Sequence, residues 1–409
     1  MSTFAAIDIG ATKVAVVVAE IDDSGNPRLI GFGETPNTGV KRGHVVDIDS
    51  AAEAVSQALR KAERMSGKSI RDITVAISGD AIRSSPSVGL VPILNPTRTI
   101  TREDVHRVIN HSKQTPLPKD RELILAVPRS YRVDGQTGVV KPVGMSGQRL
   151  EAETLLVTAP THQLDNLQKS VRAADAEVDS WVPKALASGE AVTTTSDRET
   201  GVAVIDIGGD STDVAVYQDG SVVFLKTLPV GAQNITNDIS ILLKTTLAEA
   251  ERLKQDASTC GNGGGDETVY VEQAGQRRPF NRKVLNEIVT ARAKEILLFA
   301  LEAVEEAADV RQLRSGLVLS GGGAKLKGID ELAKSLTGNT PVRIGIPEPF
   351  EGLGDLIAAP QYATAAGLIR FGARLRDQEG VAAETGDFRK LIKSFSSIFS
   401  GKSREDGTN

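Results

Sequence analysis

Apolar runs that end at an aspartate occur twice in this chain and mark an internal repeat. The triplet Asp-Ile-Gly closes one run at 8–10 and another at 206–208, and Val-Ala-Val follows shortly after each, at 14–16 and 214–216. A short run of this kind is typical of a buried strand. Each copy therefore predicts a strand, a tight glycine-containing turn and a returning strand.

Elsewhere, segments with strand and helix periods follow one another. Between 50 and 66 the apolar residues recur at helical spacing, and Thr101 with Asp104 has the form of a capping box before a further helix. The predicted strands span about 4–9, 13–21, 28–35, 73–78, 178–182, 221–230 and 268–274. The predicted helices span about 50–66, 101–113, 162–176, 184–195, 234–243, 246–254 and 281–308. Strands dominate from 122 to 160, so residues 84–160 are predicted to form a small α+β insert in an α/β chain.

The residue types in the repeated turn suit the binding of phosphate by backbone N–H groups. Glycine lets the backbone approach a phosphate without a Cβ in the way. Thr12 and Thr212 can add hydroxyl donors, and Lys13 adds a positive charge. One such hairpin alone is more often an ordinary glycine turn, but two matched copies predict a nucleotide clamp.

The two strand-end carboxylates predict a cation beside the phosphates. Asp8 and Asp206 cannot contact phosphate directly without repulsion, so we expect them to hold Mg²⁺ through its retained waters. Asp213 can assist from the second copy.

A third glycine cluster, Gly321–Gly323, follows an apolar run and precedes a predicted helix. Consecutive glycines at a strand exit suit close contact with a purine and its ribose. Glu251 and Lys254 lie three residues apart on one predicted helix face, from which they can reach that ribose. A surface ion pair is the alternative for these two residues.

The C-terminal tail carries a separate signal. Residues 374–387 are polar and lack periodicity, which predicts a linker, and residues 388–400 after them contain no acidic side chain. The apolar positions of this last segment fall on one side of a helix: Phe388, Leu391, Ile392, Phe395, Ile398 and Phe399. Its basic positions are Arg389, Lys390 and Lys393. Such a helix binds anionic lipid weakly as a single copy, so stable attachment needs several tethers acting together. A final helix packed on its own protein is the alternative.

Composition restricts the possible partners. A chain of 409 residues is too long for one core, and a net charge of −5 argues against nucleic acid as a main partner. Cys260 is the only cysteine, so no disulfide can form within the chain and a reducing cytoplasm is the expected compartment. The N-terminus lacks the features of a signal peptide, and no run approaches the roughly 18 apolar residues that span a bilayer.

At this point the motifs resemble a known family. The two Asp-Ile-Gly hairpins and the Gly321–Gly323 turn resemble the phosphate-1, phosphate-2 and adenosine motifs of the actin, hexokinase and Hsp70 superfamily. Within that superfamily, eight segments closely resemble the bacterial cell-division family FtsA. They are GHVVDID at 43–49, ERMSGKSI at 63–70, VAISGD at 75–80, PVGMSGQRLEAETLLVTAP at 142–160, LASGEAV at 186–192, LPVGAQNITNDI at 228–239, EAERLK at 249–254 and PEPFEGLGDLIAAPQYATAAGL at 347–368. The segment at 142–160 and the tail helix are the most specific, since sugar kinases and chaperones lack both.

The resemblance implies a two-lobed actin-like ATPase fold in which a small α+β insert, subdomain 1C, replaces the usual 1B. The implied boundaries are 1–83 and 161–200 for subdomain 1A, 84–160 for 1C, 201–226 for 2A, 227–314 for 2B, 315–373 for the return through 2A and the closing 1A helix, 374–387 for the linker and 388–400 for the membrane-targeting helix.

The resemblance also implies a function. FtsA-like proteins bind ATP with Mg²⁺ between the lobes and self-associate into filaments at the cytoplasmic face of the inner membrane, at the division septum. They bind the C-terminal peptide of FtsZ through subdomain 2B and recruit later divisome membrane proteins. Carried over by position, the implied nucleotide contacts are Gly10, Thr12, Lys13, Gly208, Gly209, Ser211, Thr212, Gly231, Glu251, Lys254, Gly321, Gly322 and Gly323.

Two positions depart from the family pattern. Asp210 stands where the family has a glycine that meets the γ-phosphate, and a carboxylate there repels phosphate unless it turns away or binds a cation. Lys184 stands where the family tends to carry a glutamate, at a position from which related ATPases orient the attacking water. A protonated lysine is a poor general base. We therefore expect ATP to act mainly as a structural ligand, with slow or absent hydrolysis.

Two other functions share this fold class. A sugar kinase needs a carboxylate base beside its acceptor, and residues 84–160 offer no glycine-rich sugar pocket with such an aspartate. An actin-like pilus-assembly scaffold would normally lack the basic tail helix.

Overall fold

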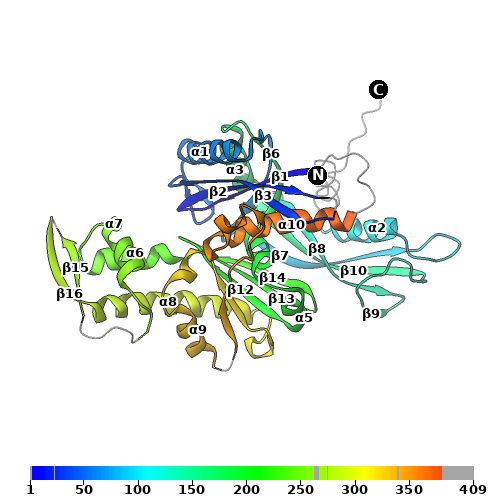
Figure 1. The fold of residues 1–409 in the computed structure, drawn as a ribbon. Helices are drawn as coiled ribbons and strands as arrows, with labels where there is room; N and C mark the ends of the chain where they lie inside the picture. The colour runs from blue at the N-terminus through cyan, green and yellow to red at the C-terminus, as the bar shows by residue number, and fades with distance from the viewer. Residues whose placement is uncertain (1, 23, 262–266, 274, 339, 380–409) are drawn as a thin grey trace.

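The computed structural model describes residues 2–22, 24–261, 267–273, 275–338 and 340–379, with side chains through Arg374. It has two lobes, each built on one mixed β-sheet, as the sequence predicts (Figure 1). In this part of the chain, no helix has both the length and the apolar character needed to cross a bilayer.

The two sheets share one strand order. The first contains β1 (Ser2–Ile9), β2 (Lys13–Ile21), β3 (Pro27–Pro36), β6 (Asp72–Ile77), β11 (Glu177–Pro183) and β19 (Glu351–Gly352). The second contains β12 (Val202–Ile207), β13 (Thr212–Gln218), β14 (Ser221–Leu228), β17 (Leu317–Ser320) and β18 (Val342–Ile344). Written from corresponding edges, their orders are β19-β3-β2-β1-β6-β11 and β14-β13-β12-β17-β18. In each sheet the central strand, β1 or β12, pairs antiparallel with its hairpin partner and parallel with the strand on its other side. The repeat seen in the two turns therefore extends to five strands of each sheet, and β19 has no counterpart in the second sheet.

Helices pack around and between the sheets. Helices α1 (Ile48–Ser66) and α3 (Thr161–Arg172) lie together on the outer side of the first sheet, while α4 (Lys184–Val192) and α10 (Ala363–Glu379) lie on its inner side, toward the second sheet (Figure 1). Helices α4 and α10 cross at backbone contact, because a Cβ on Gly367 would lie 1.7 Å from the carbonyl oxygen of Ala187. Residues of both sheets join these helices in one apolar core, which fixes the base of the interlobe cleft.

The last described helix extends further than the sequence indicates. Helix α10 continues to Glu379, so the prediction that a linker begins at residue 374 is wrong for residues 374–379. The rest of the predicted linker and the predicted membrane-targeting helix at 388–400 lie outside the described residues.

The insert forms a small domain of its own. It contains β7 (Arg83–Pro92), α2 (Arg102–Ser112), β8 (Arg121–Val133), β9 (Gln136–Val139) and β10 (Arg149–Pro160), with the sheet order β7-β10-β8-β9. Thr101 and Asp104 form the predicted capping box at the start of α2. A separate apolar cluster that includes Val108 and Leu150 gives the insert its own core.

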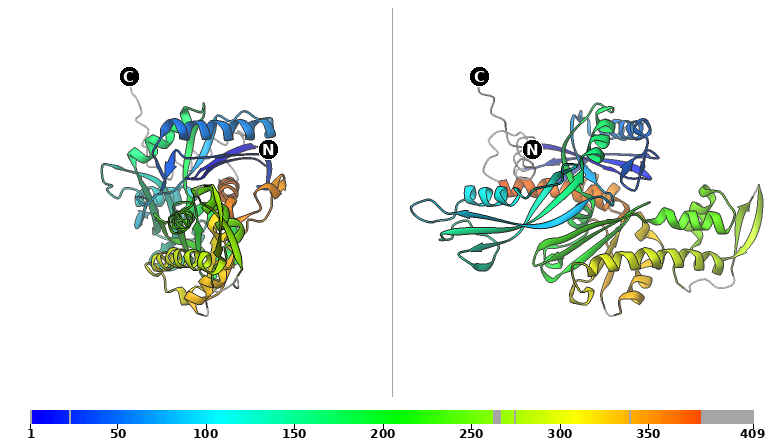
Figure 2. Two further views of the ribbon diagram at one scale, coloured as in Figure 1. Left: turned by 90° about the vertical axis from the view of Figure 1, so that its left-hand side faces the viewer. Right: turned by 180° about the vertical axis from the view of Figure 1, so that it is seen from behind.

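The second lobe also carries an extension. It contains α6 (Ala232–Leu242), α7 (Leu247–Arg252), a π-helical turn (Leu253–Ala257), β15 (Thr268–Gln273), β16 (Gln276–Asn281) and α8 (Arg282–Glu305). The insert and the β15–β16 hairpin lie at opposite ends of the molecule (Figure 2). The remaining described elements are β4 (Val40–Lys41), β5 (His44–Val45), α5 (Thr195–Thr200), α9 (Ile329–Thr337) and short 3₁₀ turns at Val310–Gln312, Gly322–Lys325, Gly354–Ile357 and Pro360–Tyr362.

Candidate functional site

The two predicted turns are closed by equivalent backbone hydrogen bonds. The N–H of Gly10 donates to the carbonyl oxygen of Lys13 over 2.9 Å, and the N–H of Gly208 donates to that of Ser211 over the same distance. Each turn connects strands whose last paired residues flank it directly. The sequence repeat is therefore a repeat of one four-residue turn.

These turns face each other across the interlobe cleft. A Cβ placed on Gly209 would lie 2.6 Å from Cγ2 of Thr12, so the two turns touch at this point. The space between them is a polar cavity of about 80 Å³. The predicted site residues that line it are Asp8, Gly10, Thr12, Lys13, Asp206, Gly208, Gly209, Ser211, Gly321 and Gly322. The structure thus gathers residues from three distant segments into one site.

Three other predicted contacts shape the second turn from behind. The hydroxyl of Thr212 is fully buried and donates to the carbonyl oxygen of Val230 over 2.8 Å. A Cβ on Gly231 would lie 2.6 Å from the carbonyl oxygen of Gly209, and one on Gly323 would lie 2.3 Å from Cγ2 of Ile207. In this structure these three residues support the turn and do not line the cavity.

Glu251 and Lys254 lie one layer away from the cavity. Their side chains form an ion pair at 2.7 Å, and the Lys254 ammonium also donates to the hydroxyl of Thr236 and the carbonyl oxygen of Ala232. Burial disfavours the charged form of Glu251, but hydrogen bonds from Lys254 and Thr236 still hold the pKa of Glu251 below its usual value. The pair therefore braces the start of α6, which follows Gly231, and is more buried than a simple surface ion pair.

The two buried carboxylates of the second copy are held by hydroxyl groups. Asp206 is 2% exposed and accepts hydrogen bonds from Ser188 and Thr364. Burial raises its pKa above the usual value, against the attraction of a nearby lysine. Asp213 accepts from Ser78 over 2.8 Å and from Thr227 over 2.6 Å, and burial raises its pKa to about 6.

The lysine that faces these carboxylates is Lys184, the first residue of α4. Its ammonium lies 3.4 Å from Oδ2 of Asp8, and it also lies in the field of Asp206 and Asp213. Although burial disfavours its charge, the three carboxylates together raise the pKa of Lys184. Besides being a poor base, Lys184 is therefore the counter-charge of these carboxylates, a role that its sequence context does not indicate.

The donor set does not fit a directly coordinated metal ion. Within the described residues, no three or more His, Cys, Asp or Glu side chains are arranged to hold one. Asp8 is instead paired with an ammonium, and the oxygens of Asp206 and Asp213 accept hydrogen bonds from hydroxyls. The prediction that Asp8 and Asp206 hold Mg²⁺ through waters stays a prediction.

Asp210, the first departure from the family pattern, turns toward the other lobe. Its carboxylate accepts a hydrogen bond of 2.5 Å from the backbone N–H of Arg42, in the turn between β4 and β5. Arg42 has a φ of +50°, in the left-handed region that non-glycine residues rarely adopt. This bond latches the two lobes together beside the cavity. Ligand sites for small molecules usually measure about 300–1,000 Å³, so the cleft is smaller than such a site in this structure.

Lys13 lines the cavity and also contacts two residues beside it. Its ammonium pairs with Glu34 at 2.7 Å and lies 3.8 Å from the ring centroid of Tyr362. Burial lowers its pKa, and Glu34 opposes that shift. The Lys13 side chain therefore both lines the cleft and contacts Glu34 and Tyr362.

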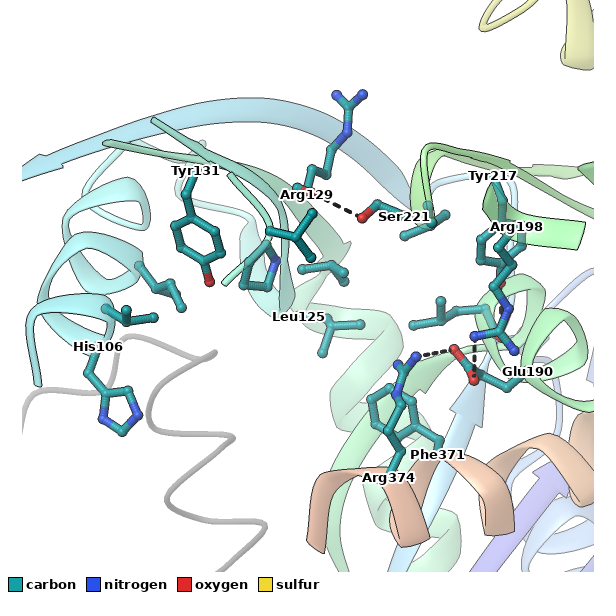
Figure 3. A pocket seen from close by; sticks show the side chains of 18 of the residues that line it. His106, Leu125, Arg129, Tyr131, Glu190, Arg198, Tyr217, Ser221, Phe371 and Arg374 are labelled. Carbon is teal, nitrogen blue, oxygen red and sulfur yellow. Dashed lines mark hydrogen bonds and ion pairs between the residues drawn. The ribbon is translucent and has the colours of Figure 1, made fainter. Parts of the chain in front are cut away.

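A larger cavity, of about 470 Å³, lies between the insert and the core (Figure 3). Its walls include apolar side chains such as Leu125 and Phe371. Glu190 forms ion pairs with both Arg198 and Arg374, at 2.9 and 2.7 Å. The positive charges of these two guanidinium groups are therefore balanced within the protein. Neither glycine turn contributes to its walls, and the smaller cleft is therefore the candidate nucleotide site.

Comparison with known proteins identifies the family. The family model described as cell division protein FtsA matches residues 203–367, and the model of the SHS2 domain inserted in that protein matches residues 79–158. The chain is 35% identical to cell division protein FtsA of Neisseria meningitidis over 374 residues, which cover 90% of each protein. It is 33% identical to that of Escherichia coli, covering 95% of this chain and 96% of the relative, and 35% identical to that of Bacillus subtilis, covering 91% and 83%.

Solved structures show the same fold at low sequence identity. The PilM–PilN type IV pilus biogenesis complex matches with a TM-score of 0.61 at 17% identity, covering 90% of this chain and 98% of that one. ADP-bound MreB5 of Spiroplasma citri gives 0.57 at 14% identity, covering 93% and 99%, and the MamK double helical filament gives 0.53 at 13%, covering 90% and 98%. The fold is therefore the actin-like ATPase fold, with the SHS2 domain as its insert. Together with the identities above, this places the chain in the FtsA family of cell division proteins.

Proposed function

We propose that this chain is an ATP-binding, membrane-tethered actin homologue that links FtsZ to the inner membrane at the division septum. The observation that carries the proposal is the cleft, where two copies of one glycine turn face each other beside Gly321 and Gly322. Backbone N–H groups presented in this way suit the phosphates of a nucleotide. Membership of the FtsA family supports the link to cell division.

The membrane tether is the amphipathic segment Phe388–Phe399, carried beyond the end of α10 at Glu379. One such helix binds lipid weakly, so the proposal includes self-association into filaments that present many helices together. The test is flotation of the full chain with anionic liposomes, compared with a chain that ends at Glu379. We expect flotation of the full chain only, and more of it with ATP. Equal flotation of both chains would remove the tether from the proposal.

The proposed binding surface for the FtsZ C-terminal peptide lies on the extension of the second lobe. Large apolar side chains are exposed there, with Ile241, Leu242 and Leu247 at the corner between α6 and α7 and Tyr270 on β15. A short peptide with apolar anchors fits such a corner. We expect Leu242→Asp to weaken binding of a labelled peptide at least about tenfold. Leu94→Asp, on an exposed leucine of the insert, is the matched control and should bind normally.

The same peptide assay separates this function from a pilus-assembly scaffold. The structural match to the pilus complex concerns the fold, at 17% identity, whereas the division proteins are 33–35% identical over most of the chain. Failure to bind the FtsZ peptide would favour the scaffold. Recruitment of later divisome membrane proteins is a further part of the proposal, and it predicts that the membrane-bound chain captures their cytoplasmic segments.

A further inference from the structure

The position of Lys184 conflicts with its local backbone. It is the first residue of α4, and the start of a helix carries a partial positive charge that disfavours a cation. The first turn of α4 contains no acidic residue, and Pro183 caps the helix without a side-chain hydrogen bond. The ammonium must therefore be stabilised from elsewhere in the fold.

The carboxylates of both turn copies provide this stabilisation. Lys184 lines the same cavity as the two glycine turns, with its ammonium 3.4 Å from Asp8 and attracted by Asp206 and Asp213. The hydrogen bonds that Asp206 and Asp213 accept come from neutral hydroxyl groups. Lys184 is thus the positive charge that the fold itself places among the acidic groups of the phosphate site.

We propose that the Lys184 ammonium takes the place of a divalent cation in this cleft, so that the chain binds a nucleoside triphosphate without requiring Mg²⁺. This inference rests on the proposed function, in which the cleft binds a nucleotide. A triphosphate that enters the cleft meets the carboxylates of Asp8, Asp206 and Asp210, and a cation must offset their repulsion. Lys13 pairs with Glu34, which does not line the cavity, whereas Lys184 pairs with Asp8, one of the cavity's own carboxylates.

The charge at position 184 decides the prediction. With lysine at this position, the cavity contains the positive charge of a side-chain ammonium. With glutamate, the charge at position 184 changes by two units. Lys13 is then the remaining lysine among the residues that line the cavity. A divalent ion should become necessary in that variant and stay dispensable in the natural protein.

The experiment measures ATP affinity of the full chain by isothermal titration calorimetry, once with excess Mg²⁺ and once with EDTA. We expect the two affinities of the natural protein to agree within about threefold. In Lys184→Glu, we expect affinity in EDTA to fall at least about tenfold and Mg²⁺ to restore most of it. Lys294→Glu, which makes the same charge change at an exposed lysine of α8 outside the cavity, is the matched control and should behave like the natural protein.

A second variant and a second readout allow for poor folding. Lys184→Gln removes the ammonium without adding a carboxylate, and its thermal unfolding midpoint shows whether the fold survives. We expect the same Mg²⁺ dependence as in Lys184→Glu, but weaker. Electron paramagnetic resonance with Mn²⁺ in the absence of nucleotide should show tighter metal binding to either variant than to the natural protein.

The outcomes are distinguishable. If the natural protein binds ATP only when Mg²⁺ is present, the inference is wrong and the proposed function stands. If it binds no ATP in either condition, the proposed nucleotide function fails as well. If Lys184→Glu and Lys184→Gln bind ATP as well in EDTA as in Mg²⁺, Lys184 is not the substitute cation.

Discussion

The two copies of the turn share a backbone and differ in charge. The first copy, from Asp8 to Lys13, meets two lysines, because Lys13 belongs to the turn and Lys184 contacts Asp8. The second copy carries three carboxylates, Asp206, Asp210 and Asp213. The glycine hydrogen bond that closes each turn is unchanged between them.

This difference shows what duplication preserved and what it left free. A tight turn depends on backbone geometry, so the glycines and the strand pairing recur. The side chains beside it depend on what the rest of the fold brings near them. In the first copy, Asp8 pairs with Lys184 at the start of α4. In the second copy, Asp213 accepts a hydrogen bond from the Ser78 hydroxyl, and Asp210 accepts one from the β4–β5 turn. The two copies therefore differ in their side-chain partners: the first carries Lys13 and an aspartate that pairs with Lys184, and the second carries Asp210, which bonds to Arg42 in the opposite lobe.

The largest effect is expected where the second copy is packed most tightly. Gly321 has a φ of +79°, and a Cβ there would lie 2.2 Å from Oδ1 of Asp206 and 2.5 Å from the carbonyl oxygen of Ile207. We expect Gly321→Ala to lower the free energy of unfolding by about 4 kcal/mol, because both strain and collision act on a buried strand end. Urea unfolding measures it.

The neighbouring glycine is the control for that prediction. A Cβ on Gly322 would meet only Gln361, at 3.9 Å. We expect Gly322→Ala to change the free energy of unfolding by less than about 0.5 kcal/mol. Equal decreases in the free energy of unfolding of the two variants would show that Gly321 is not packed closely against Asp206 and Ile207.

The second prediction concerns the pH dependence caused by Asp213. Burial raises its pKa to about 6, so between about pH 4 and pH 6 the folded protein keeps a proton that the unfolded chain loses. Since the folded state binds more protons in this window, the contribution of Asp213 to stability falls as pH rises through it, by at most about 3 kcal/mol. In Asp213→Asn this fall should be missing.

The measurement is the free energy of unfolding by urea at several pH values from 4 to 7, for the natural protein and Asp213→Asn. Asp8→Asn serves as the comparison from the first copy. If the difference between the natural protein and Asp213→Asn does not change across the window, the raised pKa is wrong.

The turns and sheets could be predicted from sequence because their signals are local. Strands buried on both faces appear as continuous apolar runs, and the Thr101 capping box lies within four neighbouring residues. Strand β16 was missed because Gln276–Asn281 is polar and contains Pro279, which suits an edge hairpin and resembles a loop in sequence. The last residues of α10 are mostly charged or polar, so in sequence they resemble a linker although they continue the helix.

The charge arrangement of the site could not be predicted in the same way. Lys184 and Asp8 are distant in sequence and meet only because β11 and β1 flank β6 in one sheet. The partner of Asp210 is a backbone N–H of Arg42, and no side-chain pattern signals a backbone donor in the opposite lobe. The position of each ionised group had to come from the fold.

The third prediction tests the latch between the lobes. Asp210→Gly removes both the bond to Arg42 and a carboxylate beside the phosphates. We expect ATP affinity to rise about tenfold, which corresponds to about 1.4 kcal/mol. Asp210→Asn keeps an acceptor for Arg42 and removes only the charge, so it should give a smaller gain. Weaker binding in Asp210→Gly would mean that this carboxylate helps to hold the nucleotide.

The smallest effect is expected for hydrolysis. The pKa of Lys184 is raised by the carboxylates around it, so at neutral pH the ammonium stays protonated and cannot take a proton from an attacking water. Asp213 does not line the cavity, and the Asp206 carboxylate already accepts hydrogen bonds from Ser188 and Thr364, so neither is positioned to replace the missing base. We expect phosphate release by the natural protein to stay within about twofold of that by Asp206→Ala, since neither accelerates the chemical step. A steady release that Asp206→Ala abolishes would show that the second copy is catalytic, and the difference between the two turns would then have to include hydrolysis.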